Sequence, residues 1–282
     1  MTKLTDTIDL SIILPAYMEA EGIALTLDRL AAFLKTREYG TVEILVVVAD
    51  SSDGTAGIAE GKSGNFQNFR VIHAGPRAGK GRDVRLGMFE ARGRYRVFMD
   101  ADLATPLEHL DEVNQLINDG AKIGIAVRDL VKIHSKIMRK CITKLGNILA
   151  QIILLPGFKD TQCGFKFFEA KTAEEIFGRM TIVGWGFDLE ILAVACKLGY
   201  EVNFIEAPDW KDPKAAGVGL VGDSAAKAAL QVFKDLIRVR WNLARGLYRS
   251  QLYFHEVHRV GSDGDSPTVG LWGVPRAEGI PQ

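Results

Sequence analysis

The sequence predicts an α/β layer fold, in which helices cover both faces of a mostly parallel sheet. Short apolar runs alternate with segments of helical spacing over the first half of the chain. These runs lack the apolar–polar alternation of a half-exposed strand, which indicates strands buried on both faces. Polar and charged residues follow the runs directly, where sheets of this kind place their ligand sites.

We expect five short strands in the first half and a less regular second half. The strands are predicted at residues 10–14, 42–48, 69–73, 95–99 and 121–127. Apolar residues at spacings of three and four predict helices at 22–37, 81–91 and 107–117. The second half shows helical patterns at 132–155 and 224–253, a helix beginning near residue 188 and a strand at 201–205.

Composition excludes several classes of protein. The 282 residues are 47% hydrophobic and 25% charged, and 35 basic residues balance 35 acidic ones. Zero net charge argues against nucleic-acid binding through bulk charge. The three cysteines lie far apart without a C-x-x-C pair, so we expect no disulfide framework or zinc ribbon and a reducing compartment.

No segment of the sequence has the length of a bilayer-spanning helix. The longest apolar stretches, 43–49 and 148–156, are far shorter than the roughly 20 residues required. The polar first nine residues do not resemble a secretory signal. We therefore expect a cytoplasmic protein that is soluble or peripheral at the cytoplasmic membrane face.

The sharpest chemical signal is F-M-D-A-D-L-A-T-P at residues 98–106. Asp100 and Asp102 follow a predicted strand at a spacing of two, which points both carboxylates the same way in extended backbone. Mg²⁺ is commonly held by one or two carboxylates together with substrate phosphates. The alternative is a turn and helix cap, but the position after a buried strand favours the metal site.

The segment G-P-R-A-G-K-G at residues 75–81 is not a P-loop. Only three residues separate Gly75 from Gly79, and Gly81 stands where Ser or Thr would bind magnesium. What remains is Lys80 at a helix N-terminus, either a diphosphate contact or part of a solvated basic loop. The H-E-V-H at 255–258 lacks the histidine spacing of a zinc protease.

In this order, the motifs resemble those of family 2 glycosyltransferases of the GT-A fold, over about residues 11–248. I-L-P-A-Y-M-E (13–19) is similar to the family's P-x-Y-N-E, with Met18 in place of Asn. The resemblance continues through E-I-L-V-V-V-A-D-S-S-D-G-T (43–55), A-G-K-G-R-D-V-R-L-G (78–87) and the D-x-D. D-T-Q-C-G-F-K-F-F (160–168) and G-W-G-F-D-L-E-I-L (184–192) resemble the dolichyl-phosphate glucosyltransferase and dolichol-phosphate mannose synthase branch.

The resemblance implies a domain organisation and a role for each matching residue. A GT-A domain would span 1–258, with a nucleotide-binding half at about 9–105 and an acceptor half at about 106–258, before a flexible tail at 259–282. The nucleoside of a UDP- or GDP-sugar would be held by Pro15, Tyr17, Glu19 and Asp50. Lys80 and Arg85 would lie near the donor, and Asp100 and Asp102 would bind Mg²⁺ or Mn²⁺ across its diphosphate. The sugar and acceptor pocket would be shaped by Asp160, Gln162, Gly164, Trp185 and Asp188.

The chemistry of the acceptor decides which further residues are needed. A lipid phosphate is already anionic at neutral pH, because the second pKa of a phosphate is about 6, so it needs cations more than a base. An acid-free run between residues 132 and 144 supplies cations, followed by the apolar stretch 148–155. The candidate phosphate ligands are Arg128, Lys136, Arg139 and Gln162, and Arg139 is also a candidate catalytic residue. A hydroxyl acceptor would instead require a base, for which Asp188 and Asp160 are the candidates.

The helical pattern at 224–253 is basic and amphipathic. Six basic residues and one acid lie between residues 227 and 249, interleaved with apolar and aromatic side chains. Such a helix either contacts an anionic membrane surface or packs on the sheet with a solvated basic face.

The leading hypothesis is a metal-dependent inverting glycosyltransferase. It would move glucose from UDP-glucose, or next mannose from GDP-mannose, to a polyprenyl or dolichyl phosphate. A same-fold enzyme with a soluble or glycan hydroxyl acceptor, and a non-catalytic nucleotide-sugar-binding protein, remain alternatives. A nucleotidyltransferase is disfavoured because no Gly-rich signature follows the first strand. The sequence does not predict an oligomeric state.

Overall fold

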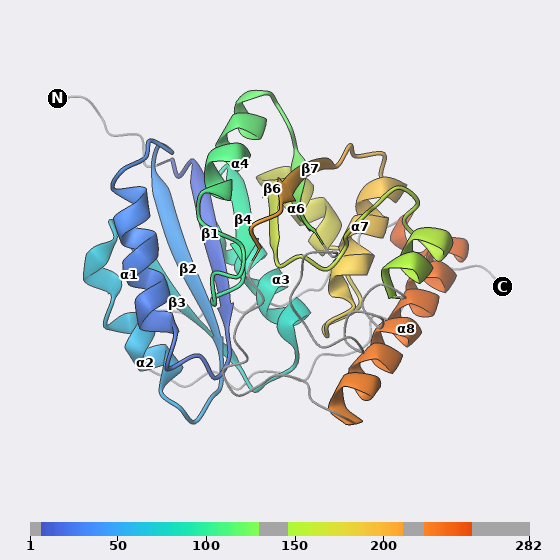
Figure 1. The fold of residues 1–282 in the computed structure, drawn as a ribbon, viewed down its shortest axis with the longest axis horizontal. Helices are drawn as coiled ribbons and strands as arrows, with labels where there is room; N and C mark the ends of the chain where they lie inside the picture. The colour runs from blue at the N-terminus through green and yellow to red at the C-terminus, as the bar shows by residue number, and fades with distance from the viewer. Residues whose placement is uncertain (1–6, 130–145, 211–222, 250–282) are drawn as a thin grey trace.

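A computed structural model of the chain describes residues 7–129, 146–210 and 223–249 (Figure 1). The strands of this part form one seven-stranded sheet in the order β3-β2-β1-β4-β6-β5-β7. Every neighbouring pair is parallel except those that β6 makes with β4 and β5. The strands are β1 (Leu10–Ala16), β2 (Val42–Ala49), β3 (Asn68–Gly75), β4 (Tyr95–Met99), β5 (Ile123–Arg128), β6 (Phe165–Glu169) and β7 (Asn203–Ala207).

Helices cover both faces of this sheet. They are α1 (Ile23–Leu34), α2 (Thr55–Glu60), α3 (Lys80–Glu90), α4 (His109–Asn118), α6 (Ala170–Phe177), α7 (Phe187–Lys197) and α8 (Asp223–Ala244), with short turns η1 (Ser63–Asn65) and η2 (Leu247–Arg249). Residues 146–153 form a further short helix. Among the described helices, none combines the length and the apolar character needed to cross a membrane.

Two hydrophobic clusters lie on opposite faces of the sheet. Ile13 of β1 belongs to the cluster that includes α3, α6 and α7, whereas Ile12 and Leu14 belong to the cluster that includes α1 and α4. Successive residues of a strand point to opposite faces, so a strand covered on both sides must be apolar at every position. The predicted mostly parallel sheet with helices on both faces is confirmed.

The predicted elements of the first half agree with the structure to within a few residues. The strand at 95–99 has the predicted bounds, and the strand predicted at 201–205 instead covers Asn203–Ala207. Of the helix predicted at 132–155, only the part from residue 146 onward falls in the described residues. The tail predicted at 259–282 and the H-E-V-H segment lie outside them. The sequence analysis did not identify α2, α6 or β6.

The direction of β6 determines which edge of the sheet the preceding segment, residues 160–164, reaches. Because β6 runs antiparallel to β4, its first residue, Phe165, pairs with Met99, the last residue of β4. The segment 160–164, which precedes β6, therefore reaches the same edge of the sheet as the D-x-D that follows β4. The loops that follow the parallel strands β1 to β5 and the segment that precedes the antiparallel strand β6 thus lie at one edge.

Candidate active site

The loop after β1 and the loop after β2 are held together by a short hydrogen-bond network. One carboxylate oxygen of Asp53 accepts the backbone N–H of Ala20 at 3.0 Å, and the other accepts the hydroxyl of Ser51 at 2.7 Å. Thr55 donates its own N–H to Asp53 and accepts the N–H of Glu19 at 3.0 Å. Burial opposes ionisation of Asp53, but these donors hold its pKa well below the usual range. The expected nucleoside residue Asp50 is exposed, and its N–H donates to the Gly75 carbonyl.

Tyr17 and Met18 are placed by the sharp turn after β1. The guanidinium of Arg77, in the loop after β3, lies 4.2 Å from the centre of the Tyr17 ring. Met18 has a φ of 58°, a left-handed conformation that side chains other than Asn, Asp and Gly rarely adopt. The Asn that stands here in the family's motif suits this backbone better than Met. Pro15 is half-buried at the end of β1.

Carboxylates crowd the edge between β1 and β4. Burial raises the pKa of Glu19 to about 7, and the charges of Asp102, Asp100 and Asp53 add to this rise. Desolvation by the surrounding protein raises the pKa of Asp102, and the charge of Asp100 adds to the rise, although Asp102 is an exposed residue. The D-x-D loop is held to α1 by the Thr26 hydroxyl, which donates to the Ala101 carbonyl. Such a concentration of negative charge favours a bound cation.

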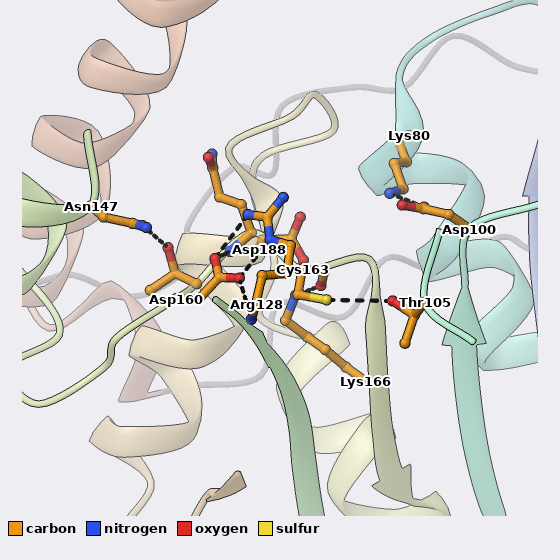
Figure 2. A network of polar contacts seen from close by, with 11 residues as sticks. Lys80, Asp100, Thr105, Arg128, Asn147, Asp160, Cys163, Lys166 and Asp188 are labelled. Atoms are coloured by element: carbon orange, nitrogen blue, oxygen red, sulfur yellow. Dashed lines mark hydrogen bonds and ion pairs between the residues drawn. The ribbon is translucent and has the colours of Figure 1, made fainter. Parts of the chain in front are cut away.

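Lys80 provides a cation within this cluster. Its ammonium donates to an oxygen of Asp100 (Figure 2). The same ammonium lies 5.6 Å from the centre of the Trp185 ring, and Trp185 is 55% exposed. Burial opposes the charge of Lys80, but the carboxylates of Asp100, Asp188 and Asp102 raise its pKa overall. The preceding Gly79 has a φ of 134°, and a side chain there would collide with the Val183 carbonyl. The glycine is therefore required for the close approach of the two loops.

The pair of aspartates fits a divalent cation that is completed by substrate. Carboxylate oxygens are the ligands that Mg²⁺ and Mn²⁺ prefer. Among the residues that the structure describes, no three or more His, Cys, Asp or Glu side chains form a group that could hold a metal by themselves. Asp100 and Asp102 could thus supply two ligands, leaving the remaining positions to phosphate oxygens and water.

The D-x-D is also in direct contact with the segment before β6. The N–H of Asp100 donates to the Gly164 carbonyl at 3.0 Å. A side chain at Gly164 would overlap the Asp100 carboxylate. The candidate metal ligands and the segment with the acceptor candidates are therefore in direct contact.

Lys166 and Asp188 form a buried ion pair next to this contact. The ammonium of Lys166 has no exposed surface and donates to Asp188 at 2.5 Å and to the Cys163 carbonyl at 2.6 Å (Figure 2). Burial raises the pKa of Asp188, and the charges of Lys166 and Lys80 oppose that rise. Alternating charges thus run from Asp100 through Lys80 and Asp188 to Lys166.

Asp160 is held by Arg128 at the end of β5. The guanidinium donates two hydrogen bonds to this fully buried carboxylate, at 2.6 and 2.9 Å, and the N–H of Gln162 adds a third at 3.1 Å (Figure 2). Burial alone would raise the pKa of Asp160, but Arg128 holds it below its ordinary value. The Arg128 guanidinium lies 5.2 Å from the Trp210 ring, beside a cavity of about 330 Å³ lined also by Asp129, Lys159, Glu206 and Pro208.

Other candidates lie apart from these clusters or outside the described residues. Arg85 of α3 donates to the Met180 carbonyl at 3.3 Å, and burial lowers its pKa to about 10, opposed by the charge of Glu190. The basic candidates Lys136 and Arg139 belong to the undescribed segment 130–145. A larger cavity of about 360 Å³ opens at the opposite edge of the sheet, where β1 and β4 begin, and contains none of the candidates.

The structure adds two residues that were not among the predicted site residues. Asp53, rather than Asp50, makes the contacts that join the first two loops. Lys166 stands in the otherwise apolar run F-K-F-F, and a lysine inside a buried strand must have a partner. That isolated charge was the available sequence signal.

Replacement of Met18 should relieve backbone strain. We expect Met18→Asn to raise the free energy of unfolding by about 0.5–1 kcal/mol, because Asn tolerates the left-handed conformation. Met18→Ala is the matched control, since it shortens the same exposed side chain but keeps the strain. Urea unfolding of the three proteins measures the effect, and equal gains in both variants would contradict the explanation.

The Arg128–Asp160 pair should make stability depend on pH. We expect Arg128→Ala to lower the free energy of unfolding by about 3–5 kcal/mol at pH 7, because it leaves a buried carboxylate unpaired. The deficit should shrink below pH about 5. Asp160 in the variant can then take up a proton, and the wild-type pair loses its contribution as pH falls through the depressed pKa.

Urea unfolding at pH 7 and at lower pH measures this deficit. Lys159→Ala, which breaks an exposed pair with Glu206, is the control and should change stability by less than about 1 kcal/mol. A deficit that stays constant with pH would argue against an ionised pair.

The sequence is similar to those of known proteins. A family model described as "Glycosyl transferase family 2" matches residues 11–177. The dolichyl-phosphate beta-glucosyltransferase of Dictyostelium discoideum is 30% identical over 260 residues, which cover 86% of this chain and 77% of that protein. The Saccharomyces cerevisiae enzyme of the same name is 31% identical, covering 86% and 78%.

Solved structures show the same fold. Glucosyl-3-phosphoglycerate synthase from Mycobacterium tuberculosis, solved with Mn²⁺, UDP and its glucosylated product, superposes with a TM-score of 0.61 and 17% identity. The match covers 83% of this chain and 80% of that one. The chain therefore belongs to glycosyl transferase family 2 and has the GT-A fold.

Proposed function

We propose that the protein transfers glucose from UDP-glucose to a polyprenyl phosphate of the dolichyl phosphate class, with Mg²⁺ or Mn²⁺ bound. The observation that carries the proposal is the joining of the D-x-D to the Arg128–Asp160 segment at one sheet edge. Two relatives that match most of the chain are named for this acceptor and this sugar. Mannose from GDP-mannose is the next candidate donor.

The donor would occupy the edge formed by the loops after β1, β2 and β4. The position proposed for the nucleoside is lined by Tyr17, Glu19 and Asp53. The Lys80 ammonium contacts Asp100, so it would lie beside a diphosphate bound through a metal on that carboxylate. Asp100 and Asp102 would hold the divalent cation, which when bound neutralises charge on the leaving diphosphate. A β-linked product from an α-linked donor requires inversion at the sugar carbon.

The acceptor would enter from the side of β5 and the segment before β6. Asp160 and Asp188 are buried carboxylates that are each paired with a cation, which suits them to positioning more than to proton abstraction. A phosphate nucleophile requires no base, so this arrangement favours a phosphate acceptor over a hydroxyl. Gln162 and Arg128, whose guanidinium also lies against the Trp210 ring, are the described candidates for contact with the acceptor phosphate. The acid-free run with Lys136 and Arg139 remains a proposed source of further cations.

A membrane location accompanies the proposed acceptor. The lipid tail of a polyprenyl phosphate resides in the bilayer, so the enzyme must work at its surface. We place it at the cytoplasmic face, because widely separated cysteines suit a reducing compartment.

A direct transfer assay tests the proposal. Purified protein would be incubated with radiolabelled UDP-glucose or GDP-mannose, Mn²⁺, and either dolichyl phosphate or a panel of soluble glycans. We expect label in the lipid phase with UDP-glucose and dolichyl phosphate, in the β configuration by NMR. Label appearing only in soluble glycans would overturn the acceptor assignment, and the absence of any transfer would favour a binding protein.

Asp102 is the cleaner aspartate to test, because Asp100 also pairs with Lys80. We expect Asp102→Asn to reduce Mn²⁺-dependent transfer at least about 100-fold, since a cation contributes several kcal/mol to charge stabilisation. The free energy of unfolding should change by less than about 1 kcal/mol, and the pKa of Glu19 should fall. Asp28→Asn, on the exposed side of α1, is the control. Full transfer by the Asp102 variant would refute the metal site.

Asp188 separates the two acceptor classes. Removing Asp188 alone would leave Lys166 buried and unpaired, so the useful variant combines Asp188→Asn with Lys166→Met. With a phosphate nucleophile we expect a loss of transfer of less than about tenfold. Removal of a general base would cost about 100- to 10,000-fold, and such a loss in a folded protein would favour a hydroxyl acceptor. Circular dichroism checks the fold, and kcat measured at saturating donor gives the comparison.

A further inference from the structure

We propose that α8 and the helix of residues 146–153 present one docking surface for an anionic bilayer. The inference rests on the proposed lipid acceptor and names the part of the protein that meets the membrane. The docking face is defined by Ile148, Ile152, Leu230, Phe233, Ile237 and Trp241. All six side chains are exposed in the structure.

Helix α8 is apolar on two opposite sides. Leu236 and Val239 are buried in the core cluster that also contains residues of α7. The stripe from Leu230 to Trp241 recurs at spacings of three and four, and at 3.6 residues per turn it falls on the side away from this core. Packing on the protein therefore accounts for one face of α8 and leaves the other without a partner among the described residues.

The exposure of this stripe is concentrated rather than scattered. Single exposed apolar residues are normal on protein surfaces, but a contiguous group marks an interaction site. Of the twelve exposed large hydrophobic residues in the described chain, six belong to the docking face. Trp241 is 63% exposed and Ile152 is 76% exposed.

The second helix contributes from the same side of the fold. Residues 146–153 lie beside α8 (Figures 1 and 2), and Ala150 is buried in the same core cluster as Leu236. Ile148 and Ile152 are one turn apart and point away from that core. Asn147 of this helix accepts a hydrogen bond from the Thr161 hydroxyl at 3.5 Å. Thr161 adjoins Asp160, so the docking face is connected directly to the proposed acceptor side.

Charge at the rim identifies a bilayer as the partner. Lys234, Arg238 and Arg245 are exposed along one border of the α8 stripe, and Arg240 is exposed along the other. In the described side chains of α8, Asp235 is the acid, and it is buried on the opposite side with a hydrogen bond from Gln231. A basic rim around an apolar stripe with a tryptophan matches the anionic headgroups and interfacial zone of a membrane. A second copy of the chain fits poorly, because a twofold contact would set these cations against one another.

Sedimentation with vesicles tests the surface. The full chain would be mixed with phosphatidylcholine vesicles containing about 30% phosphatidylserine, at low salt and at about 1 M salt. We expect pelleting at low salt that weakens at high salt. Ile237→Glu with Trp241→Glu, and separately Ile152→Glu, should each lower the vesicle partition at least about tenfold. Leu25→Glu on α1, 54% exposed at the far end of the sheet, is the matched control and should pellet like wild type.

A paired transfer assay distinguishes failure of docking from failure of the proposed function. The docking-face variants should keep transfer to a short, water-soluble prenyl phosphate and lose transfer to a long-chain one held in vesicles. Vesicle binding by wild type without transfer to either acceptor would refute the function but leave the surface intact. Pelleting that is unchanged in the variants, or equally weakened in the control, would overturn the docking face. A wild-type dimer that these substitutions dissociate, without vesicle binding, would assign the face to a second copy.

Discussion

The buried ion pair between Lys166 and Asp188 fixes the geometry on which both sides of the site depend. Neither charge could remain inside the protein alone, since removal of one partner of a buried pair typically costs about 3–5 kcal/mol. Lys166 also holds the Cys163 carbonyl, and Asp188 acts electrostatically on Lys80. One contact between β6 and α7 therefore links the segment before β6 to the charge on Lys80.

The proposed donor side contains an excess of negative charge. Glu19, Asp53, Asp100 and Asp102 gather at one edge, and Lys80 pairs with Asp100. Burial is the main cause of the raised pKa of Glu19, and the neighbouring carboxylates add to the rise, because each additional negative charge makes ionisation of the next less favourable. A site of this kind attracts cations before it attracts phosphates, so a nucleotide sugar would be favoured only together with a metal that offsets its charge.

Sequence predicted the architecture better than the direction of its strands. Apolar runs without alternation located β1, β2 and β4, because a doubly covered strand has a distinctive composition. Strand β6 was not identified because a lysine interrupts its apolar run. Its antiparallel direction could not be predicted either, since the hydrophobic pattern of a strand does not indicate its direction. Motif resemblance pointed to loops that the fold brings to one edge. It named Asp50 but not Asp53, because both follow the strand and the hydrogen bonds that Asp53 makes between the loops depend on the fold.

The two halves of the site meet largely through main-chain atoms. The Asp100 N–H reaches the Gly164 carbonyl, and the Arg82 N–H reaches the Val183 carbonyl at 3.1 Å, beside the glycine at position 79. Apart from the glycines that allow the loops to approach, contacts of this kind do not depend on the identity of the surrounding side chains. Residues that read the donor could therefore change during evolution without disturbing the alignment of the acceptor loops, and the reverse also holds. The specificity for the sugar and that for the acceptor could in this way change independently on one fold, while the glycines where the loops touch are retained.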